Sequence, residues 1–205
     1  AVACPILNAA TYRFVPVADP AALRERWLTR ALAAGLKGTI VLAEEGINLY
    51  LAGEPDALRG FVAELQADTR FADLPLKESF SDTQPFKRMR IKLKREIIRM
   101  NMPAIRPIEG RAPAVDATTL ARWLRAGRCD EGRPVVLLDT RNGFEVDAGS
   151  FEGAVDWRLH RFSEFPAALE VHKAEFEGKT VVSYCTGGIR CEKAALVMQQ
   201  AGIAH

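Results

Sequence analysis

The sequence predicts two domains, an α+β domain followed by an α/β domain with a parallel sheet. Three observations support this. The 205 residues suffice for two small domains. A proline-rich stretch near the middle, "MNMPAIRPIEGRAP", is incompatible with helix or sheet interiors and predicts a connection. The pattern also changes there, from grouped strands and helices to alternating buried strands and helices. We expect domains at residues 1–106 and 117–205, joined by a linker at 107–116.

The first expected element is "TYRFVPV" at residues 11–17, which has the composition of a strand. A helix is expected in "PAALRERWLTRALAAG", with Asp19 as N-cap, Pro20 in the first turn and Gly35 at the end. Its apolar stripe has helical spacing and consists of Leu23, Trp27, Leu28 and Leu32.

Five further elements complete the first half. "GTIVLA" and "GINLYLAG" predict two strands joined through "EEG", and a helix is expected from Asp56 to Gln66. "LPLKESFSD" and "FKRMRIKLKREI" then predict two more strands. The order strand–helix–strand–strand–helix–strand, with one extra strand, is the ferredoxin-like pattern.

The second half alternates helix and strand. Asp116 is expected to cap a helix that ends at Gly127, and "RPVVLLD" predicts a strand buried on both faces. "AVDWRL" predicts a short strand, "FPAALEVHKAEF" a helix, "KTVVSYC" a strand and "CEKAALVMQQAG" a helix. Gly202 ends that helix, and Ile203 resembles the start of another strand. We therefore expect a parallel-sheet domain that lacks its last strand and helix.

Composition excludes several classes of protein. No apolar run approaches the roughly 20 residues of a membrane helix, and no signal sequence is visible, so we expect no membrane partner. Four cysteines are too few for a disulfide scaffold, which favours the cytoplasm. No CxxC pair, zinc-like histidine spacing or dinucleotide glycine pattern occurs. We therefore predict no metal and no dinucleotide cofactor.

The stretch "VVSYCTGGIRCEKAALVMQQAG" places a cysteine where a strand meets a helix. Between Cys185 and Arg190 lie Thr186, Gly187, Gly188 and Ile189. Glycines let backbone amides turn inward, the following helix contributes its positive end, and Arg190 adds a charge. All three favour a thiolate, so we expect a lowered pKa and a nucleophilic sulfur at Cys185. The alternative is a small buried apolar residue.

The length of this loop distinguishes between chemistries. Tyrosine phosphatases place five residues between cysteine and arginine, whereas four stand here, which makes a smaller cradle. A sulfur atom carried as a persulfide suits that cradle better than a phosphate does. Cys191 follows in the first turn of the expected helix. It is either a redox partner that forms a disulfide with Cys185 or a packing residue.

Cations alternate with apolar residues in "FKRMRIKLKRE". In a strand, one face carries Met89, Ile91 and Leu93, and the other carries Arg88, Arg90, Lys92 and Lys94. The first half is also the more basic one, since residues 1–107 hold 16 Lys and Arg against 12 Asp and Glu. Contact with RNA phosphates is one interpretation and a charged edge strand that discourages aggregation is the other. No RNP-type aromatic motif accompanies the cations.

The segments "DTRNGFEVDAGSFEGAVDW" and "YCTGGIRCEKA" together resemble a rhodanese domain. Asp139 and Arg141 match its Asp-x-Arg strand end, and Glu145 matches its acidic residue in the next helix. The doubled cysteine, joined to an acylphosphatase-like domain containing "EGIN", resembles one family in particular, the rhodanese-type oxygen-dependent tRNA uridine hydroxylases (the TrhO family). This resemblance covers nearly the whole chain.

The resemblance implies conversion of the wobble uridine of tRNA to 5-hydroxyuridine, with molecular oxygen as co-substrate. Cys185 matches the family's catalytic cysteine and Arg190 its loop arginine. Ser150 departs from the pattern, because many relatives have histidine there. A rhodanese sulfurtransferase and a non-enzymatic RNA-binding module are the alternatives. tRNA is the expected partner, and no protein partner is predicted.

Overall fold

A computed structural model describes residues 5–205, so Cys4 lies outside the described residues. The chain divides into two compact units, Ala1–Ile98 and Arg99–His205. Among residues 5–205, no helix has both the length and the apolar character needed to cross a membrane.

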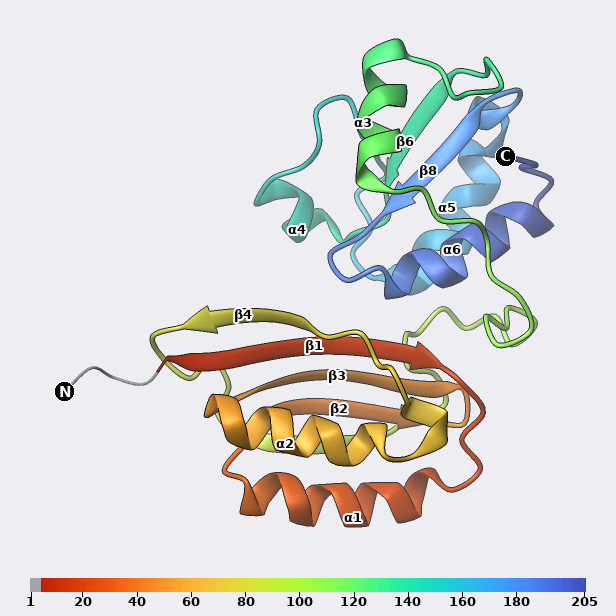
Figure 1. The fold of residues 1–205 in the computed structure, drawn as a ribbon. Coiled ribbons are helices and arrows are strands. Elements are labelled where there is room, and N and C mark those ends of the chain that lie inside the picture. Colours follow the sequence, from red (N-terminus) through yellow and green to blue (C-terminus); the bar gives the residue numbers. More distant parts are fainter. Residues whose placement is uncertain (1–4) are drawn as a thin grey trace. The chain divides into compact units, whose positions relative to one another are not determined.

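The first unit contains a five-stranded sheet and two α-helices (Figure 1). Its elements are β1 (Ile6–Phe14), α1 (Pro20–Ala33), β2 (Lys37–Ala43), β3 (Gly46–Gly53), α2 (Pro55–Gln66), the short 3₁₀ helix η1 (Thr69–Phe71), β4 (Lys77–Ser81) and β5 (Met89–Leu93). The strand order is β4-β1-β3-β2-β5, in which β5 lies parallel to β2 and all other neighbours are antiparallel. The predicted order of elements, with one extra strand, is confirmed.

Both helices cover the same face of this sheet (Figure 1). The core between them contains alternate residues of the strands, such as Leu7, Ile40 and Leu49, all fully buried. Leu23 and Trp27 of α1 pack into it and Leu28 packs against it, as the helical spacing predicts, whereas Leu32 is 59% exposed. Burial of each such large side chain contributes about 1.5–3 kcal/mol. The opposite face of the sheet carries no helix of the described part of the first unit, and we call it the helix-free face.

The start of α1 differs from the expected cap. Asp19 occupies the N-cap position, but its side chain makes no capping hydrogen bond. Its carboxylate instead accepts a hydrogen bond from Arg70 at 2.5 Å. Because the charged guanidinium is the stronger donor, it draws the carboxylate away from the helix amides.

The "EGIN" segment fastens the end of the first unit. Glu45 accepts a hydrogen bond from the backbone N–H of Ile97 at 2.6 Å, and Asn48 donates one to the carbonyl of Ile97 at 3.3 Å. Gly46 has a φ of +147°, and a side chain there would come within 2.0 Å of the carbonyl oxygen of Arg13. The glycine therefore permits close pairing of β3 with β1.

The second unit has a three-stranded parallel sheet with strand order β7-β6-β8 (Figure 1). Its elements are α3 (Ala117–Ala126), β6 (Val135–Asp139), α4 (Gly143–Asp147), β7 (Val155–Asp156), η2 (Phe162–Glu164), α5 (Phe165–His172), η3 (Lys173–Phe176), β8 (Thr180–Tyr184) and α6 (Ile189–Gln200). Asp116 caps α3 through the N–H of Thr119, and Gly127 ends it with φ +71°, as predicted. After α6, the carbonyl of His205 accepts a hydrogen bond from the N–H of Val181 in β8.

Three elements of the second unit differ from expectation. The helix expected in "FPAALEVHKAEF" ends at His172 and is followed by the 3₁₀ helix η3. The strand expected in "AVDWRL" is reduced to the two residues of β7, because Arg158 adopts a left-handed conformation with φ +53° that turns the chain. The last helix begins at Ile189, two residues before the predicted start at Cys191. Gly188 makes this early start possible, since it takes the N-cap position with φ +90°.

The proline-rich segment is part of the second unit. Residues 107–116 lie beyond the division at Ile98 and Arg99, and Ile105 is 3% exposed. Arg111 forms a double hydrogen bond with Glu192 of α6. These contacts attach the predicted linker to the helix that follows the cysteine loop.

Candidate functional site

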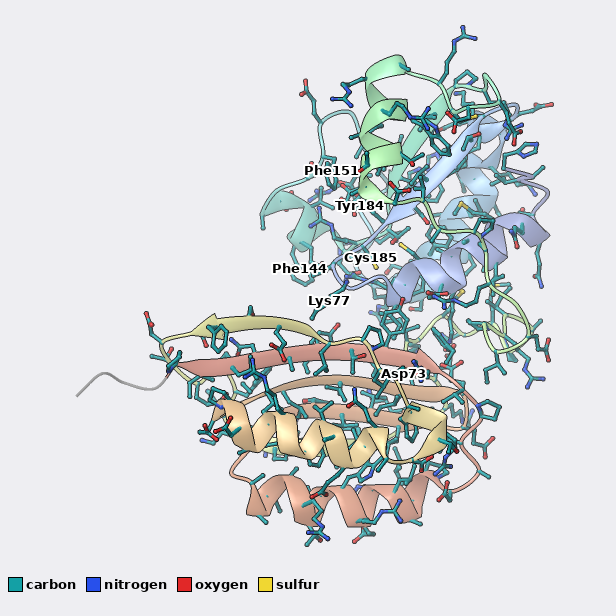
Figure 2. All side chains as sticks on the ribbon, viewed as in Figure 1. Asp73, Lys77, Phe144, Phe151, Tyr184 and Cys185 are labelled. Atoms are coloured by element: carbon teal, nitrogen blue, oxygen red, sulfur yellow. The ribbon has the colours of Figure 1, made fainter. Side chains whose placement is uncertain are left out.

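The candidate site lies where β6 and β8 end, at the carboxyl edge of the parallel sheet. Cys185 directly follows β8, and α6 begins four residues later at Ile189 (Figure 2). We call residues 185–190 the cysteine loop. Ile189 is 4% exposed and anchors the loop in the core. Ligands of parallel α/β domains commonly bind at this edge.

Several donors converge on the sulfur of Cys185. The backbone N–H of Gly188 donates to Sγ at 3.0 Å. A hydrogen bond from the Cys191 thiol lowers the pKa of Cys185 most strongly, aided by the amides of Cys191 and Arg190 and by the Arg190 charge. Together they outweigh burial and bring the pKa to about 5, in the direction expected. At neutral pH Cys185 is therefore a thiolate.

Cys191 acts as the donor in this pair of thiols. The hydrogen bond to Cys185, together with burial, raises the pKa of Cys191, so it keeps its proton. Thr140 Oγ1 lies 3.6 Å from the Cys191 sulfur, and Thr140 is fully buried. Neither cysteine is part of a disulfide in the structure. Cys191 thus lies within hydrogen-bond reach of the Cys185 sulfur, which is the sulfur–sulfur approach that the predicted redox role needs.

Arg190 is held by Glu145 of α4. Two short hydrogen bonds of 2.6 and 2.7 Å join the guanidinium to the carboxylate, and both side chains are largely buried. Thr186 Oγ1 donates to the same carboxylate at 2.9 Å. The bonds from Arg190 in particular lower the pKa of Glu145 to about 2. Because Glu145 neutralises most of its charge, Arg190 stabilises the thiolate less than a lone arginine would.

A second buried ion pair, between Asp139 and Arg141, lies next to the site at the end of β6. Asp139 at the end of β6 is 2% exposed and accepts hydrogen bonds from Arg141 at 2.8 Å and from the Tyr184 hydroxyl at 2.7 Å. Burial opposes ionisation of Asp139, but these bonds outweigh it and its pKa is lowered. Arg141 also donates to the carbonyl of Gly149 at 2.7 Å. Asp139 and Arg141 therefore fix the segment that contains Ser150, which is exposed.

Sequence reasoning missed two exposed phenylalanines in this unit. Phe144 precedes Glu145 and is 72% exposed. Phe151 follows Ser150, is 56% exposed and packs edge-on against the ring of Tyr184 at 5.0 Å (Figure 2). Their positions beside Glu145 and Ser150 were visible in the sequence, but their exposure was not. The site residues that were predicted for this unit are all brought together by the structure. They are Asp139, Arg141, Glu145, the cysteine loop and Cys191.

The basic strand belongs to the first unit. Arg90 and Lys92 lie in β5, while Arg88 and Lys94 flank it and extend its pairing with β2 through their backbones. The prediction that Met89, Ile91 and Leu93 form a buried apolar face is only partly correct, because Ile91 is buried whereas Leu93 is 48% exposed. Leu93 is the last residue of an edge strand, so one side of it meets solvent. Within residues 5–205, no group of three or more His, Cys, Asp or Glu side chains is placed to hold a metal ion.

Comparison with known proteins identifies relatives of this chain. The model of the UPF0176 acylphosphatase like domain matches residues 6–97. A protein of Variovorax paradoxus named tRNA uridine(34) hydroxylase is 66% identical over 200 residues, which cover 98% of this chain and 76% of that protein. A protein of the same name from Bordetella avium is 62% identical, with 98% and 83% covered.

Similarity to solved structures is weaker. An acylphosphatase from Coxiella burnetii is 14% identical with a TM-score of 0.30, covering 43% of this chain and 92% of that one. The family model shows that the first unit is an acylphosphatase-like domain. With relatives this similar over nearly its whole length, the chain belongs to the tRNA uridine(34) hydroxylase family.

Proposed function

We propose that this protein hydroxylates C5 of the wobble uridine of tRNA, giving 5-hydroxyuridine, with molecular oxygen as co-substrate. The names of its relatives support the reaction and the tRNA substrate. A tRNA substrate is consistent with a cytoplasmic location. The reaction replaces a C–H bond of the uracil ring by a C–OH group, so it requires a reactive group that reaches one atom of a base.

The observation that supports this most strongly is the convergence of donors on Cys185. A pKa of about 5 makes its sulfur anionic at neutral pH. We assign the reactive role to Cys185 as a thiolate or persulfide, with Arg190 and the loop amides as its stabilising groups. Residues 117–205 then form a rhodanese-like catalytic domain, an assignment supported by the parallel sheet and the cysteine loop at its carboxyl edge.

The first unit has a separate role in this proposal. Residues 1–106 bind the RNA, with Arg88, Arg90, Lys92 and Lys94 as phosphate contacts. Arg90 and Lys92 pair in register with Thr39 and Val41 of β2, so both lie on the helix-free face of the sheet. Cations at alternate positions of one strand favour contact with a repeating anion.

Sulfur transfer is the second candidate function, and the size of the cysteine loop favours it. Four residues separate Cys185 from Arg190, and the amide of Gly188 points at the sulfur from 3.0 Å. The same amides would stabilise the terminal sulfur of a persulfide. A sulfurtransferase would pass that sulfur to a thiophilic acceptor and would need no RNA.

Analysis of tRNA nucleosides tests the proposal. The chain is expressed in a bacterial strain that lacks every route to 5-hydroxyuridine, and the digested tRNA is analysed by mass spectrometry. We expect 5-hydroxyuridine with the unchanged chain and none with Cys185→Ser. Absence of the nucleoside with the unchanged chain, accompanied by transfer of sulfur from thiosulfate to cyanide, would favour the sulfurtransferase. Equal amounts from Cys185→Ser and the unchanged chain would exclude a role for the thiol.

A further inference from the structure

The helix-free face of the first unit carries a row of residues that crosses all five strands. The pairing register aligns Lys77 of β4, Ala10 of β1, Tyr50 of β3, Thr39 of β2 and Arg90 of β5. Neighbouring strands lie about 4.8 Å apart, so the row spans roughly 19 Å from Lys77 to Arg90. It has a cation at each edge of the sheet and an aromatic ring between them.

Three observations place this row on the helix-free face. Side chains alternate between faces along a strand, and Ala9, Leu49 and Leu51, the neighbours of row residues, are buried in the core beneath α1 and α2. Glu78 of β4 pairs with Arg59 of α2, so Lys77 beside it points the other way. Figure 2 shows Lys77 on the side of the sheet away from the helices.

A second row lies beside the first and repeats its character. Tyr12, Asn48, Val41 and Lys92 are aligned by the same register. The ring of Tyr12 packs edge-on against Phe14, with centroids 6.1 Å apart. The face therefore combines aromatic rings in the middle with cations at its margins, although no RNP-type motif is present in the sequence.

An open hollow of about 320 Å³ lies at the β4 end of the first row. The rings of Tyr50 and Phe86 line it together with Lys77, Ser79 and Asn8. Asn8 donates to Ser81 at 3.0 Å, while its Oδ1 is buried without a hydrogen-bond partner among the described residues. An aromatic wall, hydroxyls and a cation are the groups that recognise a nucleotide through its ring, its edge and its phosphate.

We propose that the helix-free face binds a single-stranded segment of the tRNA, with one base in the hollow stacked on Tyr50. Lys77 contacts the phosphate beside that base, and Arg90 and Lys92 contact phosphates at the far edge. The identity of the RNA rests on the proposed function. Like charges at both margins favour a polyanion, and the ring between them favours unpaired bases over a duplex, whose bases are stacked inside.

Substitution of Tyr50 tests the stacking contact. The full chain is titrated with a transcript of a tRNA that has uridine at position 34. Loss of one stacked base in Tyr50→Leu should raise Kd about tenfold, whereas Tyr50→Phe keeps the ring and should bind like the unchanged chain. Phe80→Leu is the matched control, because Phe80 is 56% exposed on the other face of the same sheet.

Substitution of Lys77 tests the phosphate contact. Lys77→Ala should reduce the slope of log K against log salt concentration by about 0.7, the value for one phosphate of a single strand. Arg26→Ala, at an exposed position of α1, should leave the slope unchanged. A thermal melt of each variant identifies any that fails to fold. If Tyr50→Leu fails to fold, Lys77→Ala decides the outcome.

Three results would overturn the inference. They are a Tyr50→Leu variant with unchanged Kd, an RNA duplex that competes as well as an unpaired strand, and a change of oligomeric state in place of RNA affinity, which would make the face a protein interface. Formation of 5-hydroxyuridine is measured separately. If the unchanged chain forms none while Tyr50→Leu still weakens binding, the proposed function fails and the RNA site stands.

Discussion

The two units arrange their polar groups in opposite ways. Around Cys185, amides, a thiol and a guanidinium from neighbouring elements converge on one sulfur. On the helix-free face, cations and rings are spread in rows over five strands. The donors gathered around Cys185 favour the charged form of one sulfur atom, as nucleophilic chemistry requires. The cations spaced along the helix-free face match the regular spacing of phosphates in a nucleic acid, as binding of a polyanion requires. The contrast predicts that chemistry and binding respond to different substitutions.

Cys185→Ser gives the largest expected effect. Because a serine hydroxyl is not ionised at neutral pH, formation of 5-hydroxyuridine should fall by at least about a thousandfold. Affinity for tRNA should be unchanged, as measured by equilibrium titration with the purified chain. Cys129→Ala is the control, since Cys129 is a free thiol of the same unit outside the cysteine loop. Equal loss of binding and chemistry in Cys185→Ser would remove the contrast between the units.

Glu145→Ala comes next in size. It leaves Arg190 as an uncompensated, largely buried charge, so the free energy of unfolding should fall by about 3 kcal/mol. Asp147→Ala is the matched control on the same helix, because the Asp147–Arg158 pair is exposed on both sides and should contribute less than about 1 kcal/mol. Urea unfolding measures both variants. Equal losses would mean that the Glu145–Arg190 pair does not fasten the cysteine loop.

Low pH should weaken the ion pair between Glu145 and Arg190. The folded-state pKa of Glu145, about 2, lies below its ordinary value of 4.5. Its contribution to stability is therefore complete above about pH 4.5 and is lost as the pH falls towards 2. Urea unfolding at several pH values should show this loss in the unchanged chain and a smaller one in Glu145→Gln. An identical pH profile for the two chains would contradict the assignment.

The pH dependence of alkylation measures the pKa of Cys185. Its rate with iodoacetamide, followed on the peptide by mass spectrometry, should rise with a midpoint near pH 5. Cys191→Ala removes the strongest stabilising hydrogen bond, so the midpoint should move up by about one unit or more. An unchanged midpoint would mean that the backbone amides and Arg190 alone stabilise the thiolate.

The smallest effect is expected on the distributed surface. Reversing two charges in Arg90→Glu with Lys92→Glu should weaken tRNA binding about tenfold and reduce its salt dependence. Chemistry should recover at saturating tRNA, because the cysteine loop is intact. Unchanged binding would favour the alternative in which these cations only protect an edge strand.

The sequence predicted features that depend on neighbouring residues better than features that depend on contacts between distant residues. The cysteine loop could be predicted because strand, glycines and helix follow one another within a few residues. The Glu145–Arg190 pair joins residues 45 positions apart, so no spacing revealed that Arg190 is occupied. The row from Lys77 to Arg90 was equally hidden, because it depends on the register of five strands and on β5 lying beside β2. The exposure of Leu93 likewise follows from an edge position that no local pattern encodes.

The hydrogen bonds that join Ile97 to Glu45 and Asn48 have a consequence for the end of the first unit. They hold the chain to the first unit until one residue before the boundary at Ile98 and Arg99. The "EGIN" segment therefore fixes the point at which the first unit ends, because it satisfies both backbone groups of Ile97.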